Sequence, residues 1–205
     1  MQSVSRTLAI KPNPSMEAKN KNRGWIVISG AMGFILIVIC LHIVQPDYDP
    51  VSQLMSELAL GRYGSFMLLA FSSFALSVFT AQSGLHQRKS TTFIRLFLFI
   101  AAISLLGAGV FRVGRAAEFH IILVAIAFVL IVLVMFLLPR NMSAFKTTTH
   151  TLISWTLGFC TATCVALGQN VVPVGIGQRG AALCILIWLV WVGYSLIRMG
   201  GPKGA

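Results

Sequence analysis

Polar and ionisable side chains gather in one stretch, from Gln45 to Gly64, which separates two long apolar segments. It reads QPDYDPVSQLMSELALGRYG and contains three of the chain's five acidic residues, Asp47, Asp49 and Glu57. Carboxylates in such a segment can cap a helix, pair with an amine, or serve as a general acid or base. We therefore expect the chemistry of this protein at this stretch and at the helix ends beside it.

Further polar residues are expected at the same end of the molecule, and together they form the predicted ligand-binding site. Its arginines suit a phosphate group, because a guanidinium donates two parallel hydrogen bonds. Its carboxylates either orient the loop or meet an amine. The predicted site residues are Asp49, Ser56, Glu57, Arg115, Glu118, His120, Gln178 and Arg179.

A catalytic interpretation of the same residues remains open. In it, His120 would act as a base, with Asp49 or Glu57 as an acid or a metal ligand. No HExxH spacing, GxSxG elbow or glycine-rich phosphate loop is present, so we assign no catalytic residue, metal or cofactor. Each of these residues also has a simpler structural interpretation, such as a helix cap at Asp49 or an ion pair between Arg115 and Glu118.

Composition indicates the elements that must position these residues. The chain has 205 residues, of which 57% are hydrophobic and only 10% charged, whereas a soluble domain has about a quarter charged residues. Runs of about 20 apolar residues predict membrane-spanning helices. The six predicted spans are 24–44, 63–81, 92–111, 119–138, 150–167 and 179–197.

The expected domain organisation is therefore an all-α, six-helix transmembrane bundle over residues 24–198. Residues 1–23 are predicted to form a basic, disordered cytoplasmic tail, and residues 199–205 a second cytoplasmic tail. The first apolar run is too long for the core of a signal peptide. The net charge of +11 is explained by basic loops and tails, so we expect no nucleic-acid partner.

The distribution of basic residues predicts the orientation. Twelve of the 16 lysines and arginines fall on the side of both termini, and four fall on the side of the Gln45–Gly64 stretch. Because basic residues are retained in the cytoplasm, both termini should be cytoplasmic. Four of the five acidic residues would then lie outside.

A short amphipathic helix is expected inside the polar stretch. Asp49 and Pro50 resemble an N-cap and a first helical residue, and Gly61 resembles a stop. Val51, Leu54, Met55 and Leu58 follow helical spacing, with Ser56 and Glu57 on the opposite side. At about 16 Å, such a helix is too short to cross the membrane and should lie at the interface.

Several motifs of this stretch resemble the domain-of-unknown-function 998 (DUF998) family. They are Tyr48-Asp49-Pro50, Ser56-Glu57-Leu58-Ala59, Gly61-x-x-Gly64, His120 at the start of a span, and Gly177-Gln178-Arg179. The resemblance covers about Gly24 to Arg198 and implies a small six-span membrane protein. Members often carry a proline and an aspartate after the third span, where this chain has Phe111 to Arg115.

We therefore expect a non-enzymatic integral membrane protein whose outer face binds a lipid headgroup or a membrane-protein partner. An intramembrane lipid hydrolase or transferase is the first alternative. A small-molecule transporter is the second, although the span centres lack the ionisable groups that ion-coupled transport usually needs. The resemblance and the size suggest a bacterial inner membrane. The sequence does not predict an oligomeric state.

Overall fold

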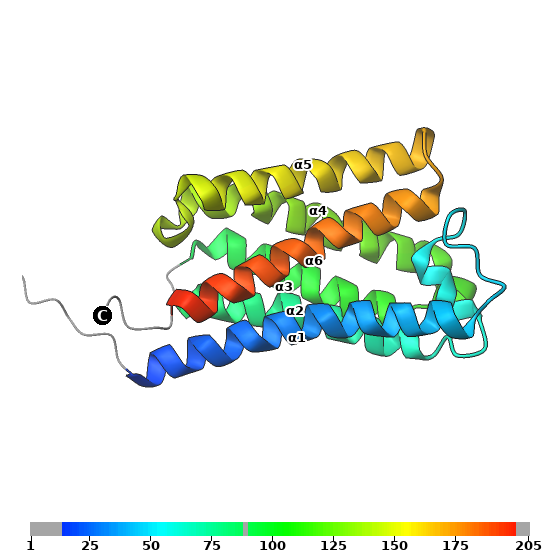
Figure 1. Cartoon of the computed structure of the whole chain (residues 1–205), viewed down its shortest axis with the longest axis horizontal. Coiled ribbons are helices and arrows are strands. Elements are labelled where there is room, and N and C mark those ends of the chain that lie inside the picture. Colours follow the sequence, from blue (N-terminus) through cyan, green and yellow to red (C-terminus); the bar gives the residue numbers. More distant parts are fainter. Residues whose placement is uncertain (1–13, 88–89, 200–205) are drawn as a thin grey trace, which may run out of the picture.

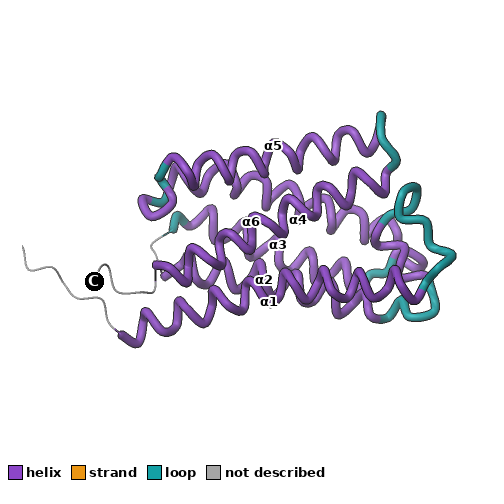
Figure 2. The backbone as a smooth tube through the Cα atoms, viewed as in Figure 1, coloured by secondary structure: helices purple, strands orange, loops and turns teal. Residues whose placement is uncertain are grey.

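The computed structural model describes residues 14–87 and 90–199, and this part of the chain is helical throughout, apart from short connections (Figures 1 and 2). Six of its helices are long and apolar enough to cross a membrane, which confirms the predicted six-span bundle. The long helices are α1 (Pro14–Val44), α2 (Phe66–Gln87), α3 (Thr92–Val110), α4 (Val113–Asn141), α5 (Thr148–Asn170) and α6 (Val174–Met199). Two short 3₁₀ helices, η1 (Met55–Leu60) and η2 (Ser143–Phe145), lie in the connections.

The six long helices form a closed ring. Each packs against the helices that precede and follow it in the sequence, and α6 returns to pack against α1. Helix α6 also contacts α2 across the bundle, so it is set inward between α1 and α5 (Figure 1). We call the end with η1 the loop end, and the end where α1 begins and α6 finishes the terminal end.

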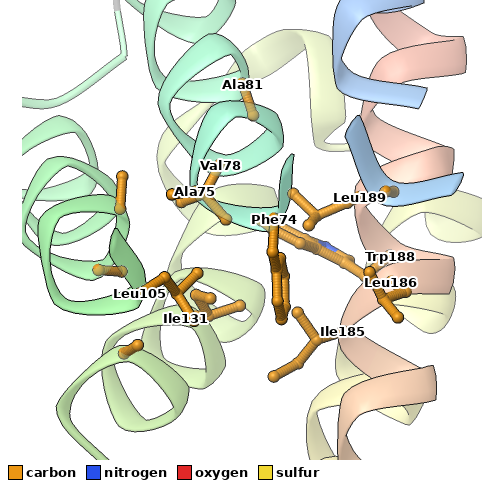
Figure 3. Close-up of a cluster of buried hydrophobic side chains, with 14 of the residues drawn as sticks. Phe74, Ala75, Val78, Ala81, Leu105, Ile131, Ile185, Leu186, Trp188 and Leu189 are labelled. Atoms are coloured by element: carbon orange, nitrogen blue, oxygen red, sulfur yellow. The ribbon is translucent and has the colours of Figure 1, made fainter. Parts of the chain in front are cut away.

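The bundle centre is filled by side chains from α2, α3, α4 and α6 (Figure 3). Phe74 of α2 and Trp188 of α6 are almost wholly buried there, beside Leu105 and Ile131. Many leucine, isoleucine and phenylalanine side chains point outward instead, as expected where lipid replaces water as the solvent.

Helices approach closely where small residues meet, as is usual when packing in lipid drives association. A Cβ atom added to Gly177 of α6 would lie 2.4 Å from Cα of Gly168 in α5. Between α1 and α2, the Ser77 hydroxyl donates a buried hydrogen bond of 2.7 Å to the carbonyl of Val27.

Helix α1 starts earlier than the sequence suggested, at Pro14 rather than Gly24. Proline suits the first helical position, where the missing N–H would have no partner within the helix. Residues 14–23 therefore extend the first span as a helix, which corrects the expectation of a disordered tail for that part. Residues 1–13 and 200–205 lie outside the described residues.

Candidate ligand-binding site

The loop between α1 and α2 begins with a turn organised by Asp49. Its carboxylate accepts hydrogen bonds from the amides of Val51 and Ser52, at 2.9 and 3.3 Å, and from the Ser52 hydroxyl. The amide of Gln53 also bonds to the carbonyl of Asp49 at 3.0 Å, which closes one helical turn. The predicted capping hydrogen bonds of Asp49 therefore form, but they close an isolated turn rather than the start of a helix.

The helix does not continue from this turn as expected, because Leu54 is extended, with φ −64° and ψ 141°. In a continuous helix the amide of Met55 would bond to the carbonyl of Val51. Here it donates instead to Oε1 of Gln178 on α6, at 2.6 Å. A 3₁₀ helix starts at Met55, so the predicted helix over about 50–60 is replaced by a turn and the shorter η1.

The change of helix type also changes which side chains are buried. A 3₁₀ helix has three residues per turn, so Met55 and Leu58 share one side, and both are buried. Ser56, predicted on the polar side, is buried as well, and Val51, predicted on the apolar side, is exposed.

Arg179 of α6 fastens this loop to the bundle. One terminal nitrogen donates to the carbonyls of Gln53 and Gly175, at 3.1 and 2.9 Å. The other contacts Nε2 of His42 at 3.1 Å and donates to the Tyr48 hydroxyl. We call these contacts the Arg179 latch, because they join residues from α1, the loop and α6.

The latch occupies most of the hydrogen-bonding capacity of Arg179. Guanidinium has five N–H donors, and the two terminal nitrogens supply four of them to the contacts above. Only the Nε–H remains, whereas bidentate recognition of a phosphate uses two parallel donors. The arrangement therefore suits Arg179 to holding the loop better than to binding a phosphate.

His42 and Tyr48 complete the latch with matching hydrogen-bond roles. Nδ1 of His42 lies 2.6 Å from the carbonyl of Val38, so it carries the proton and leaves Nε2 as an acceptor for Arg179. The Tyr48 hydroxyl donates to the carbonyl of Leu54 at 2.8 Å. The Arg179 guanidinium also lies 5.4 Å from the centre of the Tyr48 ring, within cation–π range.

The surroundings shift the pKa values of two loop residues in opposite directions. The Ser52 hydroxyl bond, followed by the Val51 amide, lowers the pKa of Asp49 from 3.8, so this exposed carboxylate is ionised at neutral pH. Partial burial raises the pKa of Tyr48 from 10.0, against the opposing hydrogen bond from Arg179. The phenol is therefore neutral at neutral pH and can keep donating to Leu54.

Glu57 and Gln178 also have structural partners within the loop end. Oε1 of Glu57 accepts from the amide of Leu54 at 3.3 Å, and Gln178 holds Met55 as described above. The hydroxyl of Ser56 is buried, with no hydrogen-bond partner within the described part of the chain. Gly175 is needed at the start of α6, because a Cβ there would lie 2.5 to 2.6 Å from three loop carbonyl oxygens.

His120 lies apart from the latch, buried inside the bundle near the loop end. Its Nδ1 is 2.8 Å from the carbonyl of Ala108 and 3.0 Å from that of Phe111, so Nδ1 carries the proton. Its ring meets the ring of Phe71 edge-on, with 5.4 Å between the centres. Nε2 is buried and has no partner among the described residues.

Comparison with known proteins decides the family. A family model described as "Protein of unknown function (DUF998)" matches residues 28–195. This chain belongs to the DUF998 family. No curated protein and no solved structure matches it.

In this DUF998 protein, the residues predicted from sequence thus fall into three groups. Asp49, Glu57, Gln178 and Arg179 come together in the loop and latch, while Ser56 and His120 are buried. Glu118 is exposed in the first turns of α4. Arg115 lies on the same helix, but its side chain is outside the described part of the structure.

The latch partners of Arg179 were not predicted from the sequence of the DUF998 chain. The signal was a histidine one turn from the end of an apolar span, His42, followed by an aromatic residue with a hydroxyl, Tyr48. Among the described residues, no group of three or more His, Cys, Asp or Glu side chains could hold a metal ion.

Proposed function

We propose that this DUF998 protein is a non-enzymatic membrane protein whose loop end binds the ammonium group of a lipid headgroup. The observation that carries the proposal is the Asp49 carboxylate, which is exposed and favoured in its charged form on a loop fastened by Arg179. Asp47, two residues away, is also exposed. A fixed anionic site of this kind suits a ligand that donates several hydrogen bonds, such as a primary ammonium.

The separate pairing of the candidate catalytic residues supports binding over catalysis. The Asp49 carboxylate accepts hydrogen bonds from its own loop, and the Glu57 carboxylate accepts one from the Leu54 amide. His120 bonds to the carbonyls of Ala108, in α3, and of Phe111, the residue after α3. A base and an acid that cooperate must reach one reacting group, directly or through one water. In our proposal the carboxylate of Asp49 meets the ligand, and Arg179 holds the loop rather than a phosphate.

Native mass spectrometry of the purified full chain tests this proposal. The protein is titrated with phosphatidylethanolamine and with phosphatidylcholine of the same acyl chains, because the second headgroup has no N–H donor. We expect tighter retention of phosphatidylethanolamine, and a loss of about tenfold in Asp49→Asn, which corresponds to about 1.4 kcal/mol. Asparagine can still cap the turn, so the loop should stay folded.

Glu118 was among the residues predicted from sequence to bind the ligand, but it takes no part in the site proposed here. Because it is an exposed carboxylate at the same end and outside the loop, Glu118→Gln is the matched control. It should retain the wild-type preference. Equal retention of both lipids by the wild type, or an unchanged preference in Asp49→Asn, would contradict headgroup binding at the loop.

A further inference from the structure

An apolar groove runs along the outer side of α6, in the half of the bundle nearer the terminal end. Its volume is about 610 Å³. It exists because α6 is set inward, so that α1 and α5 stand on either side of it (Figure 1). The groove is lined by Ile28, Leu152, Ile153, Thr156, Leu157, Ile187, Val190, Trp191 and Tyr194.

The groove faces away from the bundle centre, since Leu152, Ile187 and Tyr194 are all exposed. Its walls are fixed by two hydrogen bonds between α5 and α6. Nε1 of Trp188 donates to the Ser154 hydroxyl at 3.1 Å, and Nε1 of Trp191 donates to Nδ1 of His150 at 3.0 Å. A groove held open in this way binds a flexible chain without first having to reorganise.

Basic side chains lie beyond the end of the groove that is nearest the terminal end. The guanidinium of Arg198, one turn beyond Tyr194, lies 5.3 Å from the centre of the Tyr194 ring. Helix α1 brings more positive charge to the same place, because Gly24 packs against Ile197. Lys21, on the preceding turn of α1, is exposed, and it lies seven residues before Ile28, on the side of α1 that lines the groove.

The length of the groove fits one leaflet of a membrane. From Ile187 to Arg198, α6 rises about 16 Å, at 1.5 Å per residue. Half of a hydrocarbon core of about 30 Å is about 15 Å. A lipid with its phosphate at Arg198 would therefore place an acyl chain along Tyr194, Val190 and Ile187.

We propose that this groove is a binding site for an anionic phospholipid, with one acyl chain in the groove and the phosphate at Arg198. The apolar lining selects the chain, and Arg198 together with Lys21 selects the negative headgroup. The site is separate from the loop end and does not depend on the function proposed there. Each basic residue near a negative lipid surface adds to the attraction, so Arg198 and Lys21 act together.

The test titrates the purified full chain with phosphatidylglycerol and with phosphatidylcholine of the same acyl chains, followed by native mass spectrometry. We expect preferential retention of phosphatidylglycerol. Arg198→Gln should weaken it about fivefold to tenfold, as expected for the loss of one basic residue beside a negative headgroup. Ile187→Trp should weaken it by a similar factor, because the indole fills the groove.

Two matched variants separate the groove from general effects. Leu183→Trp adds the same indole one turn away on α6, at an exposed position outside the groove, and Lys146→Gln removes an exposed charge elsewhere at the terminal end. Both should bind as the wild type does. Equal retention of the two lipids, unchanged binding in both Ile187→Trp and Arg198→Gln, or a dimer that buries the groove would overturn the proposal.

Discussion

At the scale of single residues, Arg179 is the position where most of the loop end converges. It joins His42 of α1, Tyr48 and Gln53 of the loop, and Gly175 of its own helix. All four acceptors are neutral, so the contacts depend on the directions of the N–H groups as well as on charge. A lysine at this position would keep the charge but lose the planar fork.

We therefore predict that Arg179→Lys loosens the loop almost as much as Arg179→Ala. Alanine removes every donor, and the single ammonium of lysine cannot donate along all four directions of the fork. Each lost hydrogen bond costs about 1 kcal/mol. Hydrogen exchange of amides 51–55 should accelerate in both variants. Arg62→Ala removes an exposed arginine that lies over the Tyr63 ring, and its loop should exchange as the wild type does.

At the scale of elements, the connection between α1 and α2 is shaped by α6 rather than by its own helical pattern. The loop's Met55 amide and Gln53 carbonyl both bond to side chains of α6. Helices α5 and α6 meet through glycines at the loop end, and they are tied by two tryptophan hydrogen bonds farther along. Close backbone approach at Gly168 and Gly177 therefore sets where α6 presents Gln178 and Arg179.

Substitution at this crossing should separate the two helices. In Gly177→Ala, the new methyl group would lie 2.4 Å from Cα of Gly168, so the backbones must move apart. We predict a loss of stability of about 1–3 kcal/mol, as for other overpacked sites, measured by thermal unfolding in detergent. Gly33→Ala is the control, because its added Cβ would sit at an ordinary 3.4 Å from the Ser73 hydroxyl oxygen. Equal unfolding temperatures in the two variants would contradict this account of the crossing.

At the scale of the whole molecule, the two ends of the bundle differ in charge. The sequence predicts twelve lysines and arginines on the side of the termini and four on the side of the loop, with four of the five acidic residues on the loop side. The loop end should therefore face away from the cytoplasm. The groove would then open to the cytoplasmic leaflet, where anionic lipids attract basic residues.

Cysteine labelling of intact cells tests the orientation. A membrane-impermeant maleimide should label Asp47→Cys at the exposed loop, and it should label Lys146→Cys only after the cells are broken. The reverse pattern would show that the bundle is inverted, and the proposed outer headgroup site would then lie in the cytoplasm. The wild type, with its four free cysteines inside spans, provides the background.

The sequence by itself determined the six spans, the local hydrogen bonds of Asp49 and the family, because these depend on apolar run length, local hydrogen bonding and short motifs. Tertiary structure decided the rest. It broke the predicted helix at Leu54, since Gln178, more than a hundred residues away, supplies the acceptor that Met55 would otherwise find locally. In the packed bundle, Arg179, which was predicted to bind a phosphate, bonds to the loop instead. His120 is buried and bonds to a carbonyl of α3. A hydrogen bond between distant segments leaves no spacing in the sequence, so only the packed bundle shows which polar groups remain available to a ligand.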